Sequence, residues 1–98
     1  MAPEIVRGEE AHTSAVDIWP VGVLTFYLLT FQKYPFPGIS KESVNYKIQH
    51  SEPELFMIPN PTNDQDISNA IEFIRKCLDK NKDTRPSAKH LIDNDPWL

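Results

Sequence analysis

A run of 14 residues without a charge, from Ile18 to Phe31, constrains the fold of this chain more than any other feature. Its sequence is I-W-P-V-G-V-L-T-F-Y-L-L-T-F, and a helix built from it has apolar residues on every side. Such a helix is normally covered all round by other parts of the protein. The run is shorter than the roughly 20 residues that a membrane-spanning helix needs, so we expect a buried core helix and no membrane partner.

The length of the chain bears directly on how that helix is covered. The chain has 98 residues, and a domain of this size buries roughly 60–70% of the surface that its unfolded chain exposes. Little material is left to surround a helix that is apolar on all faces. This mismatch indicates that the chain is part of a larger folded unit.

Charge and cysteine content exclude several classes of protein. The chain has 10 Lys and Arg against 14 Asp and Glu, a formal net charge of −4, whereas proteins that bind the nucleic-acid backbone usually present a basic face. We therefore expect no nucleic-acid partner. A single cysteine, Cys77, excludes an internal disulfide, and the first residues lack the basic and apolar regions of a signal peptide. An intracellular, cytoplasmic location is the expectation.

The start of the central helix depends on which residue caps it. Ser14 and Asp17 are both good N-caps. If Asp17 is the cap, Pro20 falls at the third helical position, where its missing N–H costs little. If Ser14 is the cap, Pro20 removes an internal hydrogen bond and should kink the helix. The helix should end near residues 30–32, because the Y-P-F-P-G segment that follows cannot continue it.

The rest of the chain predicts an all-α fold with long loops. Residues 1–14 are expected to be irregular, and residues 52–61 to form an extended, proline-rich connection. Apolar residues with a helical period run from Ile67 to Leu78. The expected caps of the three further helices are Ser40 for a helix through Gln49, Asp66 for the helix through Leu78, and Ser87 for a last short helix.

Side chains that could carry chemistry are present but do not form a site. His12, His50 and His90 have no partner at metal-ligand spacing. The segment Asp64–Ser68 begins like a calcium loop but lacks the glycine and the bidentate glutamate that such a loop needs. Cys77 lies on an apolar helix face and is expected to be a small buried residue, not a nucleophile. The sequence therefore predicts no catalytic, cofactor-binding or metal site in this chain.

Four motifs, in order, carry a resemblance to a known family. They are Ala2-Pro3-Glu4, then Asp17-Ile18-Trp19 with Gly22-Val23-Leu24, then Tyr34-Pro35-Phe36, and finally Cys77-Leu78-Asp79 leading to Thr84-Arg85-Pro86-Ser87-Ala88. An A-P-E tripeptide closes the activation segment of protein kinases. With Asp95-Pro96-Trp97 in place of a terminal His-Pro-Trp, the whole chain resembles the C-terminal part of the large lobe of a eukaryotic-type serine/threonine protein kinase.

The resemblance implies a fold and a class. Residues 1–98 would be an incomplete kinase domain, with the central helix as the F helix, the pillar of the large lobe. Leu78 follows Cys77 where tyrosine kinases usually carry Trp, which favours the serine/threonine class. Two positions depart from the family pattern, since Lys82 stands where Pro is usual and Pro20 where a small residue is usual.

The resemblance also implies a role for each motif residue. Glu4 and Arg85 would form the buried ion pair of the family, and Asp17 would accept hydrogen bonds from the catalytic-loop backbone, although it could equally be a plain N-cap. Leu24 and Leu28 would support the hydrophobic spines, or could equally be ordinary core residues. The motif residues are Ala2, Pro3, Glu4, Asp17, Trp19, Gly22 and Arg85.

The catalytic motifs of the family are absent from the sequence. The Gly-rich loop, the strand lysine, the H-R-D catalytic loop and the D-F-G metal ligand would all lie upstream of residue 1. The chain alone should be inactive and without a cofactor, while ATP and Mg²⁺ belong to the complete domain. Its expected partners are the missing N-terminal part of that domain and a protein substrate or regulator. The alternative is a non-catalytic helical interaction module or pseudokinase remnant that uses a surface around Val44, Tyr46 and Ile48.

Overall fold

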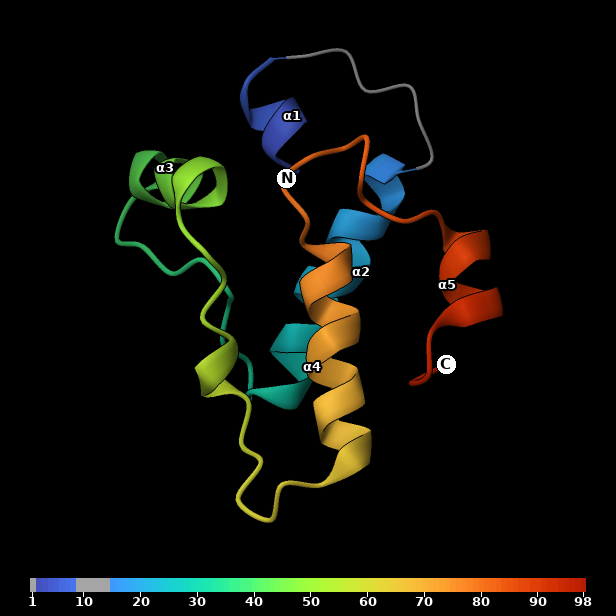
Figure 1. The fold of residues 1–98 in the computed structure, drawn as a ribbon. Coiled ribbons are helices and arrows are strands. Elements are labelled where there is room, and N and C mark those ends of the chain that lie inside the picture. Colours follow the sequence, from blue (N-terminus) through green and yellow to red (C-terminus); the bar gives the residue numbers. More distant parts are fainter. Residues whose placement is uncertain (1, 9–14) are drawn as a thin grey trace.

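The fold is known from a computed structural model, which describes residues 2–8 and 15–98 (Figure 1). Within these ranges the chain forms helices and loops without any strand, so the all-α prediction is confirmed. The prediction of an extended connection over residues 52–61 is wrong for Leu55–Met57, which form a 3₁₀ helix. The helices are α1 (Pro3–Val6), α2 (Ala15–Leu29), α3 (Lys41–His50), η1 (Leu55–Met57), α4 (Gln65–Cys77) and α5 (Ala88–Asn94).

The central helix begins earlier than an Asp17 cap would allow. Because α2 starts at Ala15, Asp17 is its third residue, and of the two alternatives the one with Asp17 as the cap is excluded. Ser14, the other candidate, lies outside the described residues. Pro20 is therefore the sixth residue of α2. It has no N–H to donate to the carbonyl of Val16, four residues earlier, so one hydrogen bond of the helix is missing.

Because Pro20 lies inside α2, replacing it should change the stability of the chain. Pro20→Ser returns the missing hydrogen bond and is expected to raise the free energy of unfolding by up to about 3 kcal/mol, less the ~0.4–1 kcal/mol by which proline restricts the unfolded chain. Urea denaturation midpoints of the two forms measure the difference. A loss of stability in Pro20→Ser would contradict the placement of Pro20 inside the helix.

The prediction that residues 1–14 are irregular is wrong for residues 3–6. These residues form α1, in which Pro3 occupies the first position, where a missing N–H costs nothing. The carbonyl of Ala2 accepts hydrogen bonds from the N–H groups of Ile5 and Val6, at 3.0 and 3.1 Å. A helix of one turn is too short to show an apolar period, so the sequence pattern could not reveal it. Residues 9–14 lie outside the described part of the chain.

Two of the three other predicted caps are confirmed. Ser40 and Ser87 each accept a hydrogen bond from the first turn of α3 and α5. The cap of α4 is Asp64, whose carboxylate accepts hydrogen bonds from the N–H groups of Asp66 and Ile67. The prediction of Asp66 as the cap is therefore wrong, and this residue lies inside the first turn, where its charge still favours the helix.

The core is built on the contact between α2 and α4. Figure 1 shows these two helices in the middle of the molecule, with α3 and α5 on opposite sides. Gly22 lets the two helices approach, because a Cβ atom added there would lie 2.7 Å from Cβ of Cys77 and 3.0 Å from Cδ2 of Leu78. Neither α2 nor any other described helix is long and apolar enough to cross a membrane.

Candidate functional site

A buried ion pair joins α1 to the loop between α4 and α5, as the resemblance implied. Nη1 of Arg85 donates to Oε2 of Glu4 at 2.8 Å, and Nη2 donates to Oε1 at 2.8 Å. Both side chains are fully buried, with 0% exposure. The Arg85 guanidinium holds the pKa of the Glu4 carboxyl below its usual value, because the hydrogen bonds favour the ionised form. This two-pronged geometry is the strongest that an arginine and a carboxylate can make.

The loop between α4 and α5 is organised so that it presents Arg85. Oδ1 of Asp79 accepts a hydrogen bond from the N–H of Asn81, and Oδ1 of Asn81 accepts one from the N–H of Asp83. The hydroxyl of Thr84 donates to Oδ2 of Asp79 at 2.7 Å. The carbonyl of Asp79 in turn accepts from Nε of Arg85 at 2.8 Å. The polar residues of this loop therefore have a structural task, which is to hold the arginine facing α1.

Trp19 contacts the guanidinium of Arg85 and connects the ion pair of Glu4 and Arg85 to the loop after α2. The Arg85 guanidinium lies 5.2 Å from the centre of the Trp19 ring, and Trp19 stacks on Phe36 at 5.7 Å with 12° between the ring planes. The ammonium of Lys80 lies 4.5 Å from the Phe36 ring on this aromatic pair. The Trp19 indole N–H is buried and has no hydrogen-bond partner among the described residues.

The structure brings most of the motif residues together and leaves two, Asp17 and Gly22, outside their cluster. Glu4, Trp19 and Arg85 form one contiguous cluster, and Ala2 and Pro3 are buried next to it at the start of α1. Asp17 is exposed and does not belong to this cluster. Gly22, one turn beyond Trp19, serves the contact between α2 and α4.

One face of α2 is not covered by the part of the chain that the structure describes. It consists of Val21, Leu24 and Leu28, which recur at helical spacing, and we call it the α2 face. Leu24 is 57% exposed and Leu28 is 68% exposed. Phe31, just past the end of the helix, is exposed as well and has a left-handed backbone with φ of 56°. The helix that the sequence predicted to be apolar all round is therefore buried on one side only.

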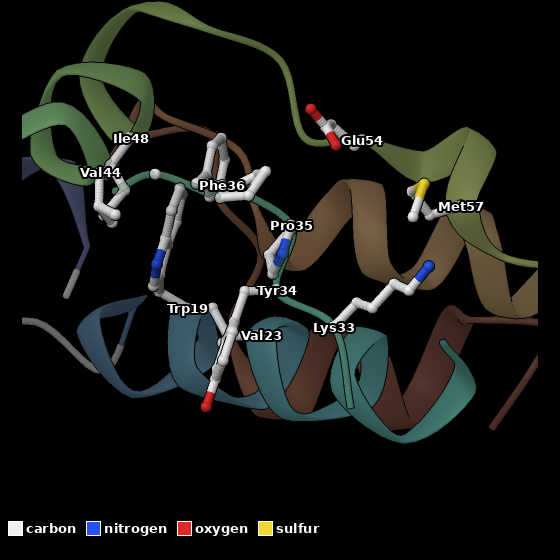
Figure 2. A pocket seen from close by; sticks show the side chains of 12 residues that line it. Trp19, Val23, Lys33, Tyr34, Pro35, Phe36, Val44, Ile48, Glu54 and Met57 are labelled. Atoms are coloured by element: carbon white, nitrogen blue, oxygen red, sulfur yellow. The ribbon is translucent and has the colours of Figure 1, made fainter. Parts of the chain in front are cut away.

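A cavity of about 660 Å³ lies between α2, the loop after it, and α3 (Figure 2). Its walls are apolar and aromatic, and include Trp19, Phe36, Val44, Ile48 and Met57, with the charged side chains of Lys33 and Glu54 also at its edge. Cavities of this size and character are typical of binding sites. Nothing in the sequence pattern pointed to it, because four separate segments supply the walls.

The surface that the sequence suggested for an interaction module does not exist as one surface. Val44 and Ile48 face the cavity, and Ile48 is buried. Tyr46, from the same helix, is exposed and pairs with the ring of His50 at 4.7 Å. The three residues alternate between two sides of α3, so they cannot contact one partner together.

Two kinds of reactive centre, a cluster of metal ligands and a reactive cysteine, are absent from the part of the chain that the structure describes. No three His, Cys, Asp or Glu side chains in residues 2–8 and 15–98 gather as a metal site. Burial raises the pKa of the Cys77 thiol to about 12, so this cysteine is not a thiolate at neutral pH. What the contacts do show is that α1, α2 and the loop between α4 and α5 are held together around Arg85.

Comparison with known proteins places the chain among kinases. The family model described as "Protein kinase domain" matches residues 1–98. The chain is 34% identical over 98 residues to the mitogen-activated protein kinase kinase kinase 3 of Arabidopsis thaliana, and 34% identical over 91 residues to the serine/threonine-protein kinase plk-1 of Caenorhabditis elegans. It is 31% identical over 91 residues to the tyrosine-protein kinase Src64B of Drosophila melanogaster. These matches cover 100%, 93% and 92% of this chain but only 15%, 13% and 15% of the relatives.

Proposed function

Because the chain belongs to the protein kinase domain family, we propose that it is the C-terminal part of the large lobe of a serine/threonine protein kinase. The observation that carries this proposal is the ion pair between Glu4 and Arg85, which lie 81 positions apart. It ties the A-P-E segment to the R-P-S segment, which are the first and last motifs of the resemblance. In this role the chain supplies a scaffold, and the reacting groups come from the preceding half of the domain.

The serine/threonine class rests on one position. Leu78 follows Cys77 where a tyrosine kinase would usually carry Trp, and Leu78 is buried against Gly22 of the central helix. Because the relatives include kinases of both classes, the assignment to the serine/threonine class depends on Leu78 alone. Phosphoamino-acid analysis of substrates labelled by the complete protein tests it, and phosphotyrosine as the sole product would contradict it.

The uncovered parts of the structure fit a missing half-domain. The α2 face exposes Leu24 and Leu28, which are the positions that support the spines in the resemblance. Asp17 is exposed at the start of the same helix, where an incoming catalytic loop would find its carboxylate as acceptor. We propose that the N-terminal part of the kinase domain covers this face and that Asp17 anchors its catalytic loop.

ATP and Mg²⁺ do not fit the residues of this chain. Mg²⁺ is usually held by carboxylates together with phosphate oxygens, and the described residues contain no cluster of three acidic, histidine or cysteine side chains. The three glycines, Gly8, Gly22 and Gly38, are too far apart to form a phosphate-binding loop. The nucleotide and metal therefore belong to the preceding half of the proposed kinase.

If nucleotide and metal bind only to the preceding half of the domain, the 98-residue chain should be inactive by itself. The 98-residue chain should show no saturable binding of Mg-ATP and no phosphoryl transfer to a generic basic peptide, because every group that would hold the γ-phosphate is missing. Calorimetry and a radiolabel assay measure the two quantities. The control is the same chain joined to the upstream half of its own domain, which should do both. Binding or transfer by the chain alone would contradict the proposal.

A second candidate function is a non-catalytic helical module or pseudokinase remnant. Pro20 favours it, because this residue interrupts the hydrogen bonds of the helix on which the whole lobe rests. The two candidates differ in the sequence that precedes the chain, since an H-R-D loop and a D-F-G motif upstream favour an active kinase. They also differ in the behaviour of the chain alone. A sharp unfolding transition in a clean monomer would favour the module.

A further inference from the structure

The helix α3 packs against α1 and contributes Val44 and Ile48 to the core. Figure 1 shows this helix to one side of the central α2 and α4 pair, and Figure 2 shows Val44 and Ile48 of α3 at one wall of the cavity. The last turn of a helix leaves carbonyl groups without helical partners. In α3 the carbonyl of Lys47 accepts a hydrogen bond from the N–H of Ser51. The carbonyl of Ile48 accepts a hydrogen bond from a side chain outside the helix.

That partner is Lys80, from the loop that follows α4. Its Nζ donates to the carbonyl oxygen of Ile48 at 2.6 Å. The same ammonium lies 4.5 Å from the centre of the Phe36 ring and 5.9 Å from that of Trp19. One charged group therefore contacts the end of α3, the loop after α2, and α2 itself, although Lys80 lies 32 positions beyond Ile48 in the sequence.

We propose that Lys80 is a positioning residue that holds the α3 wall of the cavity against the stacked pair of Trp19 and Phe36. It thereby sets the width of the cavity. Its significance for substrate or partner binding rests on the proposed kinase function. The contact itself is a property of the described fold and can be tested separately.

Three physical effects add up at this lysine. A cation at the C-terminus of a helix is favoured by the helix dipole, and here it also satisfies the free carbonyl of Ile48. A cation over aromatic rings gains more when it is partly removed from water. Lys80 is partly removed from water, because its side chain is half-buried. This burial lowers the pKa of its ammonium, while the nearby Glu52 opposes that shift. A lysine held in this way is costly to lose, because the carbonyl it leaves has no other donor among the described contacts.

The test compares three variants of the 98-residue chain by amide hydrogen exchange. Lys80→Met keeps the apolar stem but removes the donor and the charge, and Lys80→Arg keeps both. Lys89→Met, at a side chain that is 88% exposed, is the matched control. We expect exchange in α3 to become about tenfold faster in Lys80→Met relative to α4, to return largely to normal in Lys80→Arg, and to stay unchanged in Lys89→Met. Equal acceleration in α3 and α4, or none in α3, would overturn the proposal.

A second measurement addresses the cavity in the complete protein. If the α3 wall binds the protein substrate, Lys80→Met should raise KM for that substrate several-fold while KM for ATP and kcat stay the same. Faster exchange in α3 with an unchanged KM would leave Lys80 as a positioning residue of the fold and remove its link to the substrate. A complete wild-type protein without any transfer activity would instead contradict the proposed kinase function.

Discussion

Glu4→Gln and Arg85→Met are each expected to lower the free energy of unfolding by about 3–5 kcal/mol, the largest loss that we predict for any single substitution. Both side chains are fully buried and joined by two hydrogen bonds of 2.8 Å. Removing one partner leaves the other group in the interior without its counter-charge, and no water replaces the lost hydrogen bonds there. Urea denaturation of the single variants measures the loss.

A double-mutant cycle isolates the pair itself. Glu4→Gln combined with Arg85→Met should cost clearly less than the sum of the two single losses, because the second substitution removes a group that was already unpaired. The control pair is Lys89 and Asp93, whose atoms are 3.6 Å apart on the exposed side of α5. Breaking that pair should cost under about 1 kcal/mol. A coupling energy near zero for Glu4 and Arg85 would contradict their role as the link between the two motifs.

The same pair sets the response to acid. Arg85 holds the pKa of Glu4 below its ordinary value of 4.5, so the unfolded chain binds a proton on this residue more readily than the folded chain does. The stabilisation is therefore complete above pH 4.5 and is lost as the pH falls through the lower, folded pKa. The wild-type chain should lose stability in that range more steeply than Glu4→Gln, which has no carboxyl to titrate at this position.

The pairing of Glu4 with Arg85 was predictable only through the family resemblance. No periodicity links two residues that are 81 positions apart. The caps Ser40 and Ser87 followed from local chemistry, because a hydroxyl just before a helix start can accept a hydrogen bond from one free N–H group of the first turn. The local signal failed where two acidic residues competed, as at Asp64 and Asp66, since either carboxylate can reach a nearby N–H.

The cavity and its lysine could not be predicted from the sequence. The cavity walls come from α2, the loop after it, α3 and the segment around Met57, and no local pattern describes how four segments meet. Lys80 appears in the sequence as one charge in a polar loop. Only the structure shows that its ammonium contacts the end of α3 and the ring of Phe36.

The α2 face leads to a prediction whose size depends on whether the face is covered. In the 98-residue chain, Leu28 is 68% exposed, so Leu28→Ala should change the free energy of unfolding by less than about 0.5 kcal/mol. The wild-type chain should bind apolar dyes and associate with itself through such exposed surface, and Leu28→Ala should reduce both effects. Dye fluorescence and light scattering measure them.

In the complete kinase domain the same substitution should be strongly destabilising. There the missing half covers the α2 face in our proposal, and truncating a covered leucine costs about 2–5 kcal/mol. Ile92, on α5 and 70% exposed, is the matched control, because its replacement by Ala should have little effect in either context. Equal, small effects of Leu28→Ala in both contexts would mean that nothing covers the α2 face. The chain would then be a module that folds by itself, and the exposed leucines would need a different partner.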